Sequence, residues 1–326
     1  MAGKRILSGM RPSGKLHLGH LEGVLKNWVR LQDEYECFFF VADWHALTDN
    51  LDTGSRRENI LQMVVDWLSA GIDPEKAVIF VQSTVPQHTE LHLILSMLTP
   101  ISWLERCPTF KDKLRAISPS ERPSLGLLGY PVLQTADIIM YKADIVPIGE
   151  DQLAHLEIAR EIVRRFNTTY KKVFPEPQPK LTSSPKLLGL DGKKMSKSLD
   201  NSVLLSDDSE TILNKVRMMV TDPARIYLKD KGHPEVCNVF TYRKIFAPGT
   251  TEEVENACRN AKIGCTECKN KLASYVSSYL KPIQDKRKEF EGHPDRIWEM
   301  LSSGTKKAEK IAGQTIMEVR EAMNIQ

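Results

Sequence analysis

Short, unbroken apolar runs alternate with amphipathic stretches through the first half of the chain. The runs at 5–9, 37–42, 77–81 and 144–148 lack polar alternation and are bounded by turn residues, which is typical of strands buried on both faces. Between the runs, apolar residues recur at helical spacing. The clearest series are Leu21, Val24, Leu25, Trp28 and Leu31, and then Ile60, Met63, Val64 and Trp67. This alternation predicts an α/β fold with a doubly wound parallel sheet.

The second half of the chain has a different pattern. Prolines at positions 175, 177 and 179 exclude a helix in that stretch. From Asp207 onward the pattern is helical, with short breaks near 223, 233 and 248, and it ends in an amphipathic helix from about Thr305 to Met323. We therefore predict an α/β domain at 1–190 and a smaller, mostly helical domain at 191–326.

The composition narrows the class of protein. The chain has 326 residues, of which 41% are apolar and 27% charged, enough for one sizeable core and a second, smaller domain. Lys and Arg number 45 against 42 Asp and Glu, so the net charge predicts no general affinity for nucleic acid. No stretch approaches the roughly 18 apolar residues that a membrane span needs. We expect a cytoplasmic protein with no membrane partner.

Two short clusters carry the candidate chemistry. His17-Leu18-Gly19-His20 follows the first apolar run and opens a helix, and such a strand-to-helix turn directs free N–H groups at phosphate. Lys194-Met195-Ser196-Lys197-Ser198 lies past the middle of the chain and supplies two cations. Each cluster alone is a weak signal, but the pair in this order indicates an ATP site with cations that stabilise a departing pyrophosphate.

The pair resembles the HIGH and KMSKS signatures of the class I aminoacyl-tRNA synthetases, and the chain resembles the tryptophanyl enzymes most closely. The likeness extends over segments 8–14, 43–46, 104–106, 110–113, 130–137 and 144–152 as well as the lysine-serine loop. It implies a Rossmann-like (HUP-type) catalytic domain and a two-step ligase that uses ATP and Mg²⁺. The amino-acid carboxylate would attack the α-phosphate, and tRNA(Trp) would then accept the aminoacyl group.

The resemblance also implies residue roles at the ATP end of the site. The residues expected to act on the phosphates are His17, His20, Lys113, Lys194 and Lys197. Those expected to bind ATP are Arg11, Pro12, Ser13, Gly19, His20, Gly149, Glu150, Asp151, Leu187, Lys194, Met195, Ser196, Lys197 and Ser198.

Recognition of L-tryptophan needs an apolar slot that ends in an acceptor for the indole N–H, and a carboxylate is the stronger choice. Asp137 is the candidate, with Tyr130 on the same helical face and Gln152 placed to bind the ammonium. The full set expected at the amino acid is Leu7, Gly9, Arg11, Tyr130, Gln134, Asp137, Val146, Ile148 and Gln152. Arg11 and Gln134 depart from typical tryptophanyl enzymes, which carry Gln and Met there.

Three alternatives to this function stay open at the level of the sequence. The spacing of Tyr130, Gln134 and Asp137 also resembles tyrosyl enzymes, in which Gln and Asp bind a phenol. A synthetase-like protein that binds RNA or an adenylate without catalysis is the second alternative. A cofactor adenylyltransferase shares the HxGH turn, but it would not explain the 130–152 block or a helical C-terminal domain.

Four cysteines after the lysine-serine loop form a candidate metal site. Cys237, Cys258, Cys265 and Cys268 are separated by 20, 6 and 2 residues, and four thiolates complete the ligand set of a structural Zn²⁺ or a [4Fe–4S] cluster. A minority of bacterial tryptophanyl enzymes have a similar four-cysteine pattern, which favours the iron–sulfur cluster. Packing explains the two remaining cysteines at 37 and 107. The resemblance further implies a C-terminal domain that reads the tRNA anticodon, and a homodimer.

Overall fold

The computed structural model describes residues 3–48, 50–116, 122–181 and 187–325. A five-stranded parallel sheet lies at the centre of its N-terminal part, with the strand order β3-β2-β1-β4-β5. The strands are β1 (Arg5–Met10), β2 (Glu36–Val41), β3 (Ala77–Val81), β4 (Ile145–Ile148) and β5 (Gln178–Leu181). The predicted doubly wound α/β fold is confirmed. Because the strand order reverses between β1 and β4, a crevice opens at the carboxyl ends of these two strands.

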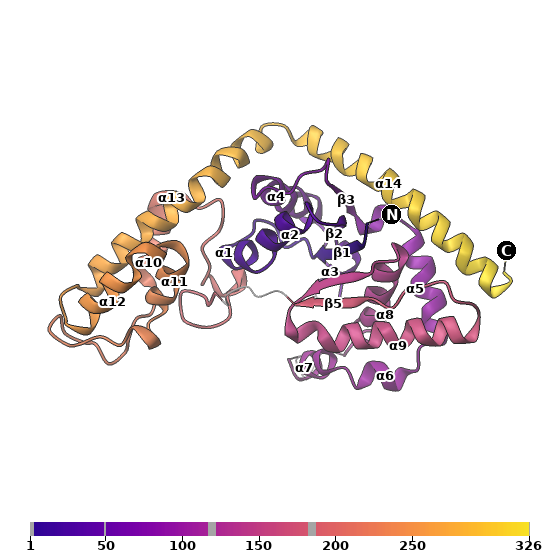
Figure 1. Cartoon of the computed structure of the whole chain (residues 1–326), viewed down its shortest axis with the longest axis horizontal. Coiled ribbons are helices and arrows are strands. Elements are labelled where there is room, and N and C mark those ends of the chain that lie inside the picture. Colours follow the sequence, from indigo (N-terminus) through magenta and orange to yellow (C-terminus); the bar gives the residue numbers. More distant parts are fainter. Residues whose placement is uncertain (1–2, 49, 117–121, 182–186, 326) are drawn as a thin grey trace.

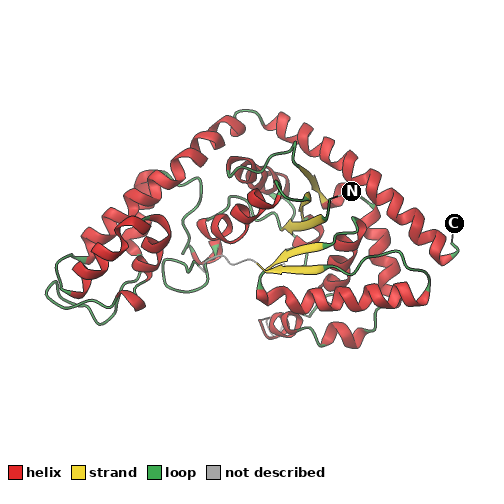
Figure 2. Ribbon diagram, viewed as in Figure 1, coloured by secondary structure: helices red, strands yellow, loops and turns green. Residues whose placement is uncertain are grey.

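Helices cover both faces of the sheet (Figures 1 and 2). On one face, Phe39 of β2 stacks on Trp28 at a ring-centroid distance of 4.4 Å. On the other face, the neighbouring residue Phe38 packs on Tyr141 at 4.9 Å. Both phenylalanine side chains are fully buried, since successive strand residues point to opposite faces. This explains why the apolar runs show no polar alternation.

The helices of the N-terminal part follow the predicted alternation. The first helical stretch consists of α1 (Leu18–His20), a π-helical turn η1 (Leu21–Leu25) and α2 (Lys26–Leu31), and α4 spans Arg56–Ser69. The others are α3 (Asp43–Ala46), α5 (Gln87–Leu98), α6 (Ile101–Glu105), α7 (Pro108–Ala116), α8 (Leu125–Met140) and α9 (Leu153–Thr169), with short 3-10 turns η2 (Gln82–Thr84) and η3 (Glu150–Gln152).

Strand β5 was not predicted from the sequence. Its register with β4 pairs Pro179 with Val146, and β5 lies at the edge of the sheet. A proline lacks the N–H that a central strand must donate, but an edge strand tolerates it. The prolines therefore exclude a helix, as expected, without excluding a strand.

Beyond Leu181, the described part of the chain consists of helices joined by loops. It contains α10 (Ser209–Met218), α11 (Asn238–Phe246), α12 (Thr251–Arg259), α13 (Cys265–Glu291) and α14 (Pro294–Met323), with 3-10 turns η4 (Lys197–Leu199), η5 (Pro234–Val236) and η6 (Pro248–Thr250). In Figure 1 the long helices α13 and α14 arch over the molecule, and α14 runs back along β3. No helix in the described ranges is long and apolar enough to cross a lipid bilayer.

The prediction that the last helix begins near Thr305 was wrong, because α14 begins at Pro294. Proline is favoured in the first turn of a helix, where its missing N–H costs nothing. Gly304 lies in the interior of this helix. A Cβ added at Gly304 would stand 1.8 Å from the carbonyl oxygen of Ile79 in β3, so the glycine permits close packing of α14 on the sheet.

Candidate active site

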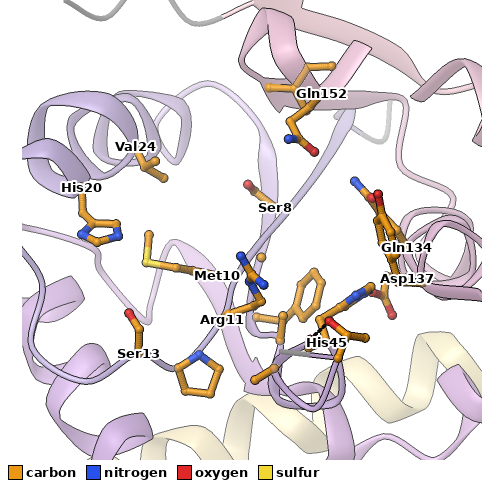
Figure 3. Close-up of a pocket in the computed structure, with 18 of the residues that line it drawn as sticks. Ser8, Met10, Arg11, Ser13, His20, Val24, His45, Gln134, Asp137 and Gln152 are labelled. Carbon is orange, nitrogen blue, oxygen red and sulfur yellow. Dashed lines mark hydrogen bonds and ion pairs between the residues drawn. The ribbon is translucent and has the colours of Figure 1, made fainter. Parts of the chain in front are cut away.

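A cavity of about 780 Å³ opens at the carboxyl ends of β1 and β4. It is lined by residues of these strands and of α3, α8 and the β4–α9 turn (Figure 3). All nine residues expected at the amino acid line it, namely Leu7, Gly9, Arg11, Tyr130, Gln134, Asp137, Val146, Ile148 and Gln152. Five of the residues expected at ATP line it as well, namely Arg11, Pro12, Ser13, His20 and Gly149, and so does Lys113.

The structure brings the two motif clusters together. Lys197 Nζ donates to the carbonyl oxygen of Ser13 and lies 3.4 Å from Ser13 Oγ. Ser13 lies between β1 and the histidine turn. The rings of His17 and His20 face each other at a centroid distance of 3.8 Å. A lysine from the second cluster therefore reaches the loop that leads into the first cluster.

Both histidines of the turn are neutral at pH 7. Burial, followed by the charge of Lys197, lowers the pKa of His17 to about 4. Burial lowers the pKa of His20 to about 3, with contributions from His17 and Lys197. Because neutral imidazole still offers one N–H, the turn can donate hydrogen bonds to a phosphate without carrying its own positive charge.

The remaining residues of the lysine-serine loop surround this turn. The sulfur of Met195, a buried residue, lies 3.3 Å from the position where a Cβ on Gly19 would stand. Leu187 is buried in the same cluster. Asn201 fixes the loop, since its amide accepts from Ser196 N at 2.8 Å and donates to the Lys194 carbonyl at 3.1 Å. Lys194 itself is exposed, and the side chain of Ser198 lies outside the described residues.

Lys113 lies at the amino-acid end of the cavity. Its ammonium is 5.4 Å from the centre of the Tyr130 ring, and burial together with the charge of Arg11 lowers the pKa of Lys113. Figure 3 shows Arg11 pointing from the end of β1 into the pocket, on the side opposite Gln134 and Asp137. Arg11 and Lys113 thus place two cations in the lining of the cavity.

Asp137 is buried at the bottom of the pocket and holds a network that the sequence did not reveal. His45 Nε2 lies 2.8 Å from one carboxylate oxygen, and His88 Nδ1 lies 2.7 Å from the other. The amide of Gln82 spans both oxygens at 2.8 and 2.9 Å. Burial raises the pKa of Asp137, but the hydrogen bonds from His45 and His88 outweigh it and hold the pKa well below its usual range.

His88 extends this network because its Nε2 lies 2.8 Å from the hydroxyl of Tyr141. The available sequence signal was positional. Gln82 follows the carboxyl end of β3 directly and His45 lies in α3, just beyond the carboxyl end of β2, where ligand-facing polar residues gather in parallel sheets. The two carboxylate oxygens of Asp137 therefore receive four contacts from three donor groups, which hold the carboxylate in one orientation.

The turn between β4 and α9 carries four expected residues, of which Gly149 and Gln152 line the cavity. A Cβ on Gly149 would lie 2.7 Å from Asp151 Oδ1, so the glycine lets this turn close tightly. Glu150 and Asp151 are exposed. Gln152 donates from Nε2 to Asp151 Oδ2 at 3.0 Å, which orients the Gln152 amide.

The four cysteines of the candidate metal site are neighbours. Charge on Cys258 interacts with each of Cys237, Cys265 and Cys268, and all four are half-buried free thiols. Arg225 lies 3.6 Å from the Cys258 sulfur, and Arg243 lies 3.8 Å from the Cys268 sulfur. Within the described residues, no group of three or more metal-ligating side chains is arranged to hold an ion.

Comparisons with known proteins identify the family. Residues 3–281 match the model of the tRNA synthetases class I (W and Y), and the chain therefore belongs to this class of synthetases. A tryptophan–tRNA ligase from Thermotoga maritima is 48% identical over 98% of this chain and 99% of its own. A tryptophan–tRNA ligase from Aquifex aeolicus is 42% identical over 98% of this chain and 100% of its own. Within the class, the chain belongs to the tryptophan–tRNA ligases.

A solved structure agrees with this assignment. The crystal structure of the tryptophanyl-tRNA synthetase from Campylobacter jejuni, in complex with ADP and tryptophan, superimposes with a TM-score of 0.89 at 34% identity. The match covers 98% of this chain and 100% of that chain.

Proposed function

We propose that the cavity between β1 and β4 activates L-tryptophan with MgATP and transfers it to tRNA(Trp). The activity is that of a tryptophan–tRNA ligase, in line with relatives 39–48% identical over nearly the whole chain. These relatives favour tryptophan over tyrosine and a ligase over a non-catalytic binding protein. The observation that carries the proposal is one cavity lined by both the amino-acid residues and the histidine turn.

In the first step, a carboxylate oxygen of tryptophan attacks the α-phosphorus of ATP, and the bond to the bridging oxygen breaks to release pyrophosphate. His17, His20 and Lys197 donate to the phosphates as charge moves onto the leaving group, a role supported by the contact of Lys197 with the loop before the histidine turn. Mg²⁺ arrives with the triphosphate as part of the substrate. In the second step, a ribose hydroxyl of tRNA(Trp) attacks the activated carbonyl, and AMP leaves.

For recognition of the amino acid, we propose that Asp137 accepts the indole N–H and that Tyr130 and Gln152 accept from the ammonium. His45, Gln82 and His88 hold the Asp137 carboxylate ionised and oriented. Arg11 supplies a cation for the substrate carboxylate. Leu7, Val146 and Ile148 are the apolar walls.

ATP–pyrophosphate exchange with each of the twenty amino acids tests this function. Exchange driven by tryptophan in the wild type, and lost in Asp137→Asn, supports the proposal. Asp33→Asn on the exposed surface is the matched control and leaves exchange unchanged. Exchange driven by tyrosine would assign a tyrosyl enzyme, and no exchange with any amino acid would assign a binding protein.

For the four cysteines, we infer a metal centre held by Cys237, Cys258, Cys265 and Cys268, as a [4Fe–4S] cluster or alternatively a Zn²⁺ ion. The donor set and the proximity of the four thiols support it. Burial raises the pKa of Cys258 and Cys268, and the charges of Arg225 and Arg243 act in the opposite direction, toward the thiolate forms that bind metal. Bound metal would link the residue that caps the start of α11 to helices α12 and α13.

Metal analysis of protein purified without oxygen tests this site. About four iron and four sulfide per chain with visible absorption would assign the cluster, and one zinc without colour would assign Zn²⁺. Cys265→Ser is expected to lose the metal, whereas Cys37→Ala in β2 keeps it. A wild type that binds neither metal would refute the site.

Four further assignments complete the proposal. We propose that residues 1–190 form the catalytic domain and 191–326 the domain that reads the tRNA anticodon. A cytoplasmic location fits a tRNA substrate. A homodimer is supported by exposed apolar residues on α5 and α6, where Leu93, Met97 and Ile101 are 58%, 76% and 61% exposed. Light scattering of the wild type and Met97→Glu tests the dimer.

A further inference from the structure

His155 connects the two side chains proposed to bind the substrate ammonium. It lies on α9, three residues after Gln152, and is 3% exposed. Its Nδ1 is 2.8 Å from Gln152 Oε1, and its Nε2 is 2.5 Å from the hydroxyl oxygen of Tyr130. All three side chains line the cavity.

Asp151, Gln152, His155 and Tyr130 form a series of hydrogen bonds. The Asp151 carboxylate determines the direction of each of them. The Asp151 carboxylate can only accept, so the Gln152 group that lies 3.0 Å from it is the NH₂ group. The Gln152 oxygen therefore faces His155. Because that oxygen can only accept, Nδ1 of His155 must carry the proton.

The same reasoning extends to Tyr130. In a neutral imidazole one nitrogen donates and the other accepts, so Nε2 of His155 accepts and the Tyr130 hydroxyl donates to it. The hydroxyl also has a hydrogen bond with the side chain of Thr109, and it lies 3.8 Å from the sulfur of Cys107. The contact between the Tyr130 hydroxyl and His155 is 2.5 Å, far shorter than the 3.8 Å to Cys107, so the hydroxyl proton lies toward His155.

We propose that His155 is a positioning residue that turns the Tyr130 hydroxyl proton away from the pocket. Both Tyr130 Oη and Gln152 Oε1 then present lone pairs to the amino-acid ammonium, which has three donors and no acceptor. Without His155 the hydroxyl proton is free to point into the pocket, where it opposes the ammonium. This inference rests on the proposed function, in which Tyr130 and Gln152 bind that group.

Two ligands separate this role from a general structural one. L-tryptophan and indole-3-propionic acid share the indole and the carboxylate, but only tryptophan has the ammonium. In His155→Phe, the Kd of tryptophan is expected to rise about 5- to 30-fold, the effect of losing one or two hydrogen bonds. The Kd of indole-3-propionic acid is expected to change less than 2-fold, and the KM for ATP stays as in the wild type.

His155→Gln is the conservative variant, because its amide oxygen can reach the place of Nε2 and accept from Tyr130. It is expected to recover most of the tryptophan affinity. His293→Phe, an exposed histidine on the loop between α13 and α14, is the matched control and leaves both ligands unaffected. Thermal unfolding of each variant verifies that the protein is folded before binding is measured by calorimetry.

The outcomes distinguish this inference from the proposed function. The positioning role would be overturned if His155→Phe bound tryptophan and indole-3-propionic acid more weakly by the same factor. It would also be overturned if His155→Gln did not recover the affinity for tryptophan. Tyr130→Phe tests whether the Tyr130 hydroxyl contacts the ammonium. If it does, this variant must weaken the binding of tryptophan but not that of indole-3-propionic acid. Should Tyr130→Phe weaken both ligands equally, the ammonium site itself is wrong, and the inference about His155 fails with it.

Discussion

Arg287 of α13 forms a buried ion pair with Asp66 of α4, and both side chains are at most 2% exposed. The second oxygen of Asp66 accepts from the backbone N–H of Leu16 at 2.6 Å, one residue before His17. Burial raises the pKa of Asp66 to about 6, while the charge of Arg287 and the Leu16 N–H act in the opposite direction. The carboxylate is therefore ionised at pH 7. A helix of the C-terminal part is thus connected to the histidine turn through one side chain.

Removing one partner of this pair is expected to destabilise the protein strongly. Arg287→Met leaves the Asp66 charge buried without its cation, at a cost of about 3–5 kcal/mol. It also loosens the anchor of Leu16, so the KM for ATP should rise. Urea unfolding and exchange kinetics measure the two effects. The double variant Asp66→Leu/Arg287→Met should recover much of the free energy of unfolding, but its KM for ATP should stay raised. A loss of less than about 1 kcal/mol of unfolding free energy in Arg287→Met would contradict this account.

Lys197 and the nearby exposed residue Lys193 form a matched pair for testing the lysine-serine loop. Lys197 reaches Ser13, so Lys197→Ala removes a cation from the phosphate end. We expect kcat for ATP–pyrophosphate exchange to fall about 10²- to 10³-fold, as when one charge-stabilising donor is removed. Lys193→Ala should leave kcat within about twofold. Similar losses in the two variants would argue against a specific role for Lys197.

Much of the sheet could be predicted from the sequence because strands buried on both faces have a distinct pattern. Phe38 and Phe39 lie on opposite faces of β2 and are both buried, which produces an unbroken apolar run. Strand β5 lacks this signal, since it is an edge strand whose residues are mostly exposed. Its recognition requires knowledge of its pairing with β4.

The motifs also identified which residues gather at the site, but not how they are held. His45 and His88 contact Asp137 across 92 and 49 positions of sequence, and Arg287 contacts Asp66 across 221. Apart from the position of His45 shortly after β2, no local pattern distinguishes such residues from surface polar residues. His155 lies only three residues after Gln152, and its helical spacing from an expected site residue was a signal that could have identified it.

The lowered pKa of His17 makes stability depend on pH in a defined direction. The unfolded histidine titrates near 6.5 and the folded one near 4, so between these values the unfolded state binds more protons. The free energy of unfolding therefore falls as the pH is lowered through this window. His17→Asn lacks this titration, so its free energy of unfolding should fall less than that of the wild type. Between pH 7 and pH 4 the difference between the two proteins should change by about 1–3 kcal/mol in favour of the variant. The exposed variant His293→Asn should show no such gain, and parallel curves for wild type and His17→Asn would contradict the prediction.

Two glycines of α14 should respond in opposite ways to the same substitution. A Cβ at Gly304 would meet the Ile79 carbonyl at 1.8 Å, whereas nothing lies within 4 Å of a Cβ at Gly313. Alanine favours a helix interior over glycine by about 1 kcal/mol, so Gly313→Ala should stabilise the protein by up to this amount. Gly304→Ala should destabilise it by about 1–3 kcal/mol, because α14 must move away from β3. Urea unfolding of both variants measures the difference, and a stabilised Gly304→Ala would show that α14 does not pack against β3 in solution.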